Sequence, residues 1–156
     1  MGATRTALRI WIPTNRHYSS GAPKGMDGWN EIVRQNRRGK QYAAKCEREN
    51  VTWCAWYVKK AMTEQGWKPM HDELAAVRCQ LMITFWEPNC RRDVPNIYGQ
   101  TKYAIDALTA RHRYGAAAIY DDSQRWMSPH IDMKVEVDKK RVGIAIVVVP
   151  LIGQKG

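Results

Sequence analysis

Residues 87–124 read EPNCRRDVPNIYGQTKYAIDALTARHRYGAAAIYDDSQ, and the rest of the chain is interpreted from this stretch. It holds four aspartates, Asp93, Asp106, Asp121 and Asp122, in a protein of formal net charge +10. Carboxylate oxygens are the usual protein ligands of Mg²⁺, and neighbouring Arg and Lys can hold the phosphates that such an ion polarises. The stretch therefore indicates a site for a hard cation. Ordinary caps, turns and surface positions are the alternative, because charged side chains mostly face solvent.

Positive charge is concentrated in the first part of the chain. Residues 1–60 hold 12 Lys and Arg against 4 Asp and Glu, whereas residues 61–156 hold 13 against 11. A sequence pI near 9.7 suits a polyanionic partner, although a merely basic protein would share it.

The polar segment 13–40 is expected to form a basic loop, because Gly21, Pro23, Gly25 and Gly28 favour turns. Tyr18 and Trp29 lie between its cations, a composition that suits phosphate contacts and stacking on unpaired bases. A solvated loop with Trp29 tucked against the core is the alternative. The cations are Arg16, Lys24, Arg34, Arg37, Arg38 and Lys40.

Three apolar patterns predict regular structure before residue 87. Residues 5–12 read as a strand ended by Pro13. Residues 41–65 have helical spacing and end at Gly66. Residues 74–86 are so rich in apolar and β-forming side chains that a strand covered on both faces is expected. The apolar face of the helix is Val51, Cys54, Ala55, Val58, Ala61 and Met62, and Trp53, Trp56 and Tyr57 are expected to pack on the sheet.

The second half predicts one more helix and two strands. Pro95 can open a helix that Gly115 ends, with Lys102 and Asp106 together on a face away from its apolar side. Without a functional role, Lys102 and Asp106 would form a surface ion pair worth a few tenths of a kcal/mol. Residues 131–138 alternate as a half-buried strand, residues 139–141 form a hairpin turn, and residues 142–149 return as a second strand. Residues 151–156 are expected to be a frayed tail.

These patterns predict one α+β domain over residues 1–156. Its small mixed sheet carries two main helices in the approximate order β-α-β-α-β-β. The chain has no apolar run of spanning length and no leader-like segment at its start, so a cytoplasmic protein is expected. Four irregularly spaced cysteines favour reduced thiols over zinc or disulfides. The four scattered histidines predict no histidine-based metal site.

Three motifs in order resemble the RusA family, small bacterial and phage endonucleases that resolve four-way (Holliday) DNA junctions. They are Arg-Arg-Asp-x-x-Asn at 91–96, Lys-x-x-x-Asp-Ala-Leu-Thr at 102–109 and Asp-Asp-Ser-Gln at 121–124. The earlier Pro13-Thr14-Asn15 is similar to the start that follows the family's first strand. The resemblance covers roughly residues 8–150, and only the motifs within 91–124 are specific.

The resemblance implies a Mg²⁺-dependent endonuclease for branched DNA, with Mn²⁺ as a substitute and no organic cofactor. Asp93 and Asp122 would hold the ion, and Lys102 would compensate charge at the phosphate. The family implies a homodimer, and two-fold symmetry suits the paired cutting positions of a junction. Further nucleic-acid contacts would come from Asn15, Arg91, Arg92 and Asn96.

Two departures fall at the site itself. The family usually writes Arg-Asp-x-Asp-Asn, and here Pro95 stands where its second metal-binding aspartate would be. The segment 96–102 is also about three residues longer than in the best-known member. Asp106 or Asp121 could supply the missing ligand. A branched-DNA-binding protein that no longer cuts, or a nuclease for another structured nucleic acid, are therefore alternatives.

Overall fold

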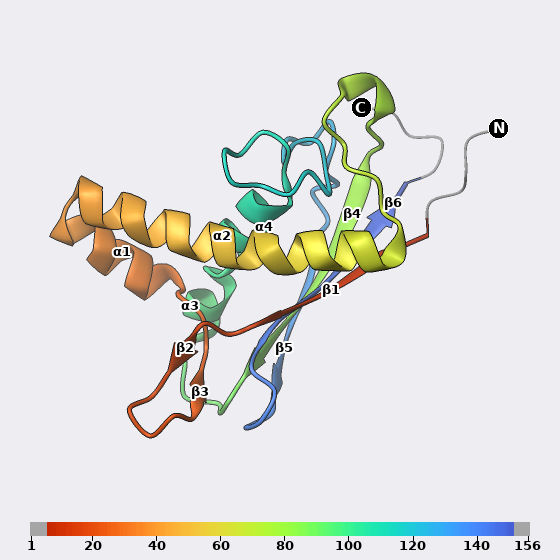
Figure 1. Ribbon diagram of the computed structural model, residues 1–156. Helices are drawn as coiled ribbons and strands as arrows, with labels where there is room; N and C mark the ends of the chain where they lie inside the picture. The colour runs from red at the N-terminus through yellow and green to blue at the C-terminus, as the bar shows by residue number, and fades with distance from the viewer. Residues whose placement is uncertain (1–5, 152–156) are drawn as a thin grey trace.

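Strands of alternating burial form a four-stranded mixed sheet in the computed structural model, which describes residues 6–151. Its spatial order is β1-β6-β4-β5, and a separate two-stranded hairpin is made by β2 and β3. The long helix α2 lies across the sheet, with α1, α3 and α4 beside it (Figure 1). The elements are β1 (Leu8–Pro13), β2 (Arg16–His17), β3 (Pro23–Lys24), α1 (Trp29–Arg38), α2 (Lys40–Gln65), the short 3₁₀ helix η1 (Glu73–Ala75), β4 (Cys79–Glu87), α3 (Val94–Tyr98), α4 (Thr101–Leu108), β5 (Asp132–Val137) and β6 (Gly143–Pro150).

Helix α2 confirms the prediction from helical spacing. Its buried residues are the six predicted ones together with Asn50. They pack against the buried alternate residues of the sheet, such as Ile10, Ile146 and Ile83. Gly66 ends the helix in the left-handed conformation, with φ of 68°, and its N–H donates to the carbonyl of Met62. Glycine accepts this conformation without the steric cost that a Cβ adds.

An α+β architecture with a mixed sheet is confirmed, but the expected hairpin of the last two strands is wrong. Among the strands of residues 6–151, β5 pairs only with β4, in parallel, and β6 lies antiparallel between β1 and β4. The turn at 139–141 therefore carries the chain past β4 rather than between neighbouring strands. Local alternation of side chains does not specify which strand becomes the partner.

The basic segment 13–40 is not a loop throughout, because it contains β2, β3 and α1. Helix α1 was missed since only Ile32 and Gln35 of its ten residues are buried, which leaves little apolar periodicity. Its start depends on distant residues: the side-chain oxygen of Asn96 accepts the N–H of Asn30 at 2.8 Å. Trp29 at its start is 49% exposed rather than tucked into the core.

The helix expected after Pro95 is divided into α3 and α4 at Gly99 and Gln100. A Cβ on Gly99 would overlap the backbone nitrogen of Trp29, so α1 packs directly on this break. Pro95 stands in the first turn of α3, as predicted. Helix α4 ends at Leu108, well before Gly115, and is followed by a loop through the acidic pair.

The apolar segment 74–86 begins with η1, and β4 is buried on one face only. Met82 on the other face is 44% exposed. Of the three aromatic residues of α2 expected to pack on the sheet, Trp56 faces outward and is 59% exposed. Trp53 and Tyr57 pack partly buried against the core, and the indole N–H of Trp53 donates to the carbonyl of Pro13 in β1 at 2.7 Å. Residue 5 of the predicted first strand and most of the predicted tail lie outside the described residues.

Candidate functional site

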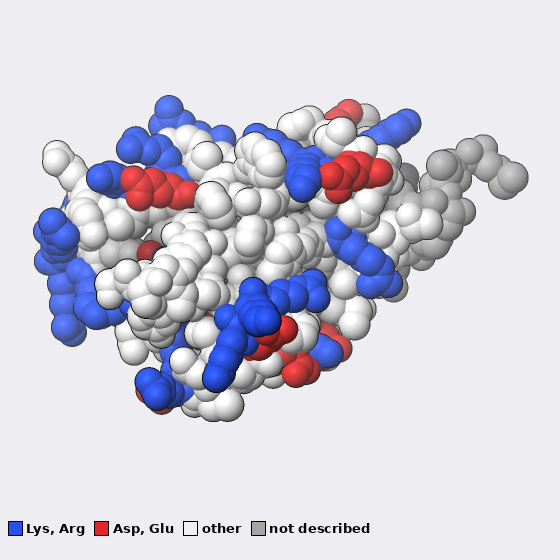
Figure 2. Space-filling model, turned by 60° about the horizontal axis from the view of Figure 1, so that its bottom comes forward, with Lys and Arg blue, Asp and Glu red and all other residues white. Residues whose placement is uncertain are grey.

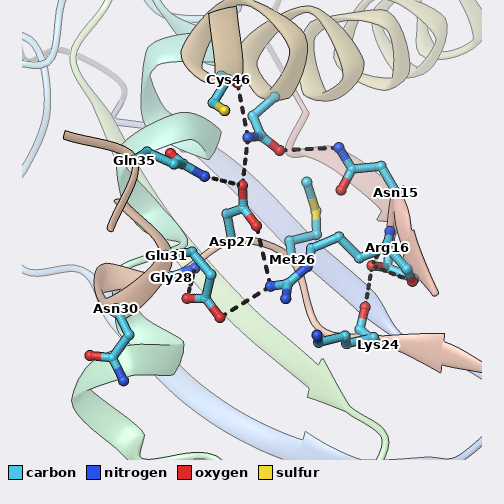
Figure 3. Close-up of polar contacts among 12 residues, drawn as sticks. Asn15, Arg16, Lys24, Met26, Asp27, Gly28, Asn30, Glu31, Gln35 and Cys46 are labelled. Atoms are coloured by element: carbon cyan, nitrogen blue, oxygen red, sulfur yellow. Dashed lines mark hydrogen bonds and ion pairs between the residues drawn. The ribbon is translucent and has the colours of Figure 1, made fainter. Parts of the chain in front are cut away.

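A network of ion pairs joins the basic segment to the motif at 91–96. Arg16 contacts Asp27 and Glu31, both at 3.2 Å. Arg92 contacts Glu31 at 3.2 Å and Glu87 at 3.3 Å, and it donates to the carbonyl of Met26 at 2.6 Å. Figure 3 shows Arg16 reaching toward both Asp27 and Glu31. Because both arginines are largely buried, at 20% and 16% side-chain exposure, each has its charge compensated by carboxylates.

The two inner carboxyls of this network have opposite pKa shifts. For Glu31 burial raises the pKa, but Arg92, backbone N–H groups and Arg16 outweigh it and hold the value at about 2. For Glu87 burial is the larger effect, so its pKa is raised although Arg92 and Arg16 act against it. Glu87 is 2% exposed, and its second oxygen has no hydrogen-bond partner. Glu31 and Glu87 are both held by ion pairs with Arg92, so they serve to fix the basic segment against the 91–96 motif.

Amide side chains extend the network toward α2 and α4. Asp27 accepts hydrogen bonds from Gln35 at 2.7 Å and Asn50 at 3.0 Å (Figure 3). Asn50 in turn accepts from Asn15 at 3.1 Å, and Gln35 accepts from the hydroxyl of Tyr103 at 3.1 Å. The predicted nucleic-acid contact Asn15 thus lies within this network, beside the buried Asn50.

Residues predicted to contact nucleic acid gather around one hollow beside the network. Its volume is about 200 Å³, and the predicted residues that line it are Arg16, Lys24, Arg91, Arg92 and Asn96. Gly25 also lines it, and a Cβ there would overlap Glu87, so the chain must approach closely at this point. Asn96 is only 7% exposed, and its side-chain oxygen is used by α1.

The remaining predicted cations lie where α1 turns into α2. Arg34, Arg37, Arg38 and Lys40 are exposed there, and Figure 2 shows Lys and Arg gathered at this end of the molecule. Arg38 lies over the ring of Tyr42, 4.0 Å from its centroid. The side chains stand in solvent on a rigid helical corner, which suits contact with a polyanion.

A second polar cluster, formed by Glu47, Asp106 and His112, lies between α2 and the α4 region. One ligand atom from each lies within 4.8 Å of the others. His112 Nε2 is 3.1 Å from Glu47 and 3.9 Å from Asp106. Lys102 lies 3.6 Å from Asp106, as their spacing predicted. Lys102 and Glu47 also line a hollow of about 230 Å³ that Lys40 shares.

The imidazole of His112 is oriented to donate to the carboxylates. Its Nδ1 accepts the backbone N–H of Tyr114 at 3.1 Å. An accepting Nδ1 carries no proton, so the neutral ring has its proton on Nε2, the atom that faces Glu47 and Asp106. A metal-bound histidine normally donates through its other nitrogen, which is the opposite arrangement. In this orientation only the carboxylate oxygens of the cluster are free to bind a cation, and oxygen ligands fit Mg²⁺ or Mn²⁺.

Negative charge accumulates at Asp106. Burial raises its pKa; Lys102 and His112 act against this, and the charges of Glu47 and Asp122 raise the pKa further. The charge of Asp122 therefore repels that of Asp106, although Asp122 does not join the cluster of ligand atoms. A divalent cation at this place would relieve that repulsion. By donor chemistry the residues present fit a hard cation.

The other predicted ligands are placed differently. Asp93 is exposed at the N-cap of α3, and its side chain makes no capping hydrogen bond. Within residues 6–151, Asp93, Asp121 and Asp122 do not join the cluster of three ligand atoms. Glu47 and His112 were missed from the sequence. Glu47 had a detectable signature, since it lies four residues before Val51 on the apolar stripe of α2, whereas His112 depends on the fold of the loop.

Comparisons with models of protein families, with curated proteins and with solved structures gave no match. No helix in the described part of the chain has both the length and the apolar character to cross a membrane. Within the described residues no disulfide joins the four cysteines, and Cys54 and Cys79 are buried.

Proposed function

We propose that this protein is a divalent-metal-dependent endonuclease that cuts branched DNA, above all four-way junctions, as the resemblance to the RusA family implies. The observation that carries the proposal is that Lys102, Asp106 and Glu47 lie close together, at a hollow that Lys40 also lines. Lys102 and Asp106 come from the family-like motif, while Glu47 and Lys40 come from a helix that begins more than 60 residues earlier. Carboxylates and cations for a phosphate are thus within one small region.

Each group has a task in phosphodiester hydrolysis. Lys102 is 39% exposed and is positioned by Asp106, so its ammonium can face a phosphate oxygen and compensate developing charge. Lys40 lies at the same hollow and can hold a neighbouring phosphate. The Nε2–H of His112 fixes the Glu47 carboxylate and limits its rotation. The exposed arginines at the α1–α2 corner would hold a DNA arm.

Glu47 and Asp106 are the residues at this place that would hold Mg²⁺ or Mn²⁺. Asp93 and Asp122 are added as ligands on the resemblance to the family alone. When bound, such an ion polarises the phosphate and lowers the pKa of an attacking water. Pro95 offers no side-chain oxygen, so the neighbouring carboxylates of α2 and α4 would replace the family's second aspartate. A two-fold dimer in the cytoplasm with one site per subunit completes the proposal.

A nicking assay tests this directly. The full chain is incubated with Mg²⁺, Mn²⁺ or chelator on labelled four-way junction, fork, linear duplex and structured RNA. We expect metal-dependent, paired incisions in the junction. Asp93→Asn and Asp122→Asn should each abolish cutting and leave junction binding unchanged or tighter, because removing negative charge beside phosphates does not weaken their attraction.

The exposed, remote Glu64→Gln is the matched control and should cut as the wild type does. Cleavage by Asp93→Asn or Asp122→Asn at the wild-type rate would show that the ligand assignment is wrong. Tight junction binding without cutting in any metal would favour the alternative of a binding protein, which the absence of the second aspartate motivates. Preferred cutting of forks or RNA would favour the third alternative.

A further inference from the structure

The sheet has one open face that is apolar at its centre and charged along its edge strands. On the side away from α2, alternate residues of the two central strands β4 and β6 are only partly covered. Met82 is 44% exposed and lies beside Val147. The guanidinium of Arg141 covers Trp11 and Trp86, at 4.4 and 5.3 Å from their ring centroids. Two layers normally enclose an apolar sheet face, and here the described residues provide a layer on one side only.

The strand register arranges this face in rows that cross the sheet from β1 to β5. The first row is Arg9, Val147, Met82 and Asp132; the second is Trp11, Ala145, Thr84 and Lys134; the third is Pro13, Gly143, Trp86 and Glu136. Paired residues in a sheet point to the same side, so each row shares one face. Every row thus has a charged residue on β5. At the β1 end of the rows, Arg9 is charged in the first row, and Arg141, which follows β5 in the sequence, lies over Trp11 in the second.

Two orientations keep the strands of both copies aligned when the faces pack together with two-fold symmetry. An axis parallel to the strands places β1 of one copy over β5 of the other and keeps the rows at the same height. Arg9 then faces Asp132, and Lys134 faces Trp11, over whose ring Arg141 also lies. At the centre Met82 faces Val147. Sheets packed in this aligned manner stand about 10 Å apart, within reach of these side chains.

An axis perpendicular to the strands gives the opposite result. It places β5 over β5 with the row order reversed, so Asp132 faces Glu136 and Lys134 faces its own copy. Like charges at an interface disfavour it. The first orientation pairs Arg9 with Asp132 and avoids the contact between Asp132 and Glu136, so it is the one that the edge charges favour.

We propose that the open face of the sheet is the surface on which a second copy of this chain docks, with the two-fold axis parallel to the strands. The proposal deepens the dimer part of the proposed function by naming the surface and the contacts. It would cover Met82 and Trp86, the two apolar side chains on the outer face of β4. It also leaves the α1–α2 corner of each copy, where the exposed arginines lie, outside the interface.

Sedimentation velocity of the full chain without DNA measures the dimer dissociation constant. Arg9→Glu and Asp132→Arg should each raise it at least about tenfold, because each substitution acts twice in a symmetric interface. The double variant Arg9→Glu/Asp132→Arg restores both opposite-charge contacts and should return to near the wild-type constant. Met82→Lys, at the centre, should leave a monomer. Circular dichroism checks that each variant is folded.

A wild-type chain that stays monomeric at about 100 µM would overturn the proposal. Single charge reversals without effect, or a double variant no better than the singles, would overturn it as well. Loss of the dimer in Trp56→Ala, with Met82→Lys still dimeric, would assign the contact to the outer face of α2 instead. Since these readouts need no DNA or metal, a protein that dimerises but does not cut separates this inference from the nuclease proposal.

Discussion

At the scale of single residues, Asp106 matters most because it lies between a cation, an imidazole and two other acids. If it replaces the ligand that Pro95 lacks, Asp106→Asn should raise the Mn²⁺ concentration for half-maximal cutting at least about tenfold. Loss of one carboxylate removes both a ligand and a charge from the site. Pro95→Asp in the Asp106→Asn background should restore most of the affinity. Calorimetric titration with Mn²⁺ provides the same comparison without DNA.

Glu49→Gln, an exposed neighbour of Glu47 on α2, is the control for that series and should bind Mn²⁺ normally. Equal metal affinity in Asp106→Asn and the wild type would show that Asp106 serves only to position Lys102.

Glu31 gives a prediction about pH, because it is the acid shared by Arg16 and Arg92. Its folded pKa of about 2 lies below the ordinary value of 4.5. The ionised carboxylate therefore stabilises the fold fully above pH 4.5, and this contribution is lost as the pH falls toward 2. The shift corresponds to about 3 kcal/mol. The gap in unfolding free energy between wild type and Glu31→Gln should be largest at pH 6 and much smaller at pH 3.

Urea unfolding at both pH values measures this gap. Glu64→Gln removes an exposed pair with Lys60 and should change stability by less than about 0.5 kcal/mol at either pH. A gap for Glu31→Gln that is the same at pH 6 and pH 3 would contradict the assignment.

At the scale of secondary-structure elements, α1 depends on α3 for its N-terminus. Asn96→Ala removes the acceptor for the N–H of Asn30 in a buried position and should lower the unfolding free energy by about 1 to 2 kcal/mol. Asn96→Asp keeps an acceptor oxygen and should cost less. Thermal or urea unfolding distinguishes a structural role for Asn96 from the predicted DNA contact. A variant with full stability but weaker DNA binding would favour the contact.

At the scale of the whole molecule, the position of the charge determines how DNA is held. Arg37→Ala/Arg38→Ala removes two exposed cations at the α1–α2 corner and should reduce the log–log slope of DNA affinity against salt by roughly 2. Lys139→Ala/Lys140→Ala removes the same charge from the exposed turn after β5 and is the matched control. Fluorescence anisotropy across salt concentrations measures both slopes. Equal slopes for the two double variants would mean that the corner faces away from DNA.

Local patterns in the sequence determined the elements that have strong periodicity. The apolar stripe of α2, the left-handed Gly66 that ends it and the helix opened near Pro95 are set by interactions within a few residues. The pairing of Lys102 with Asp106 is likewise a property of four residues on one helix. The α+β class followed from these local patterns.

Three features were decided by the tertiary structure alone: the order of the strands, the formation of helix α1, and the residues that surround Asp106. β6 enters between β1 and β4 because strand partners are chosen by packing across the whole sheet, which alternation along one strand does not encode. Helix α1 forms with few apolar residues because Asn96 and the ion-pair network hold it. Glu47 reaches Asp106 and His112 only when α2 packs on α4, since contacts between residues as far apart in sequence as Glu47 and His112 exist only in the folded chain. His112 approaches Asp106 through the fold of the loop after α4.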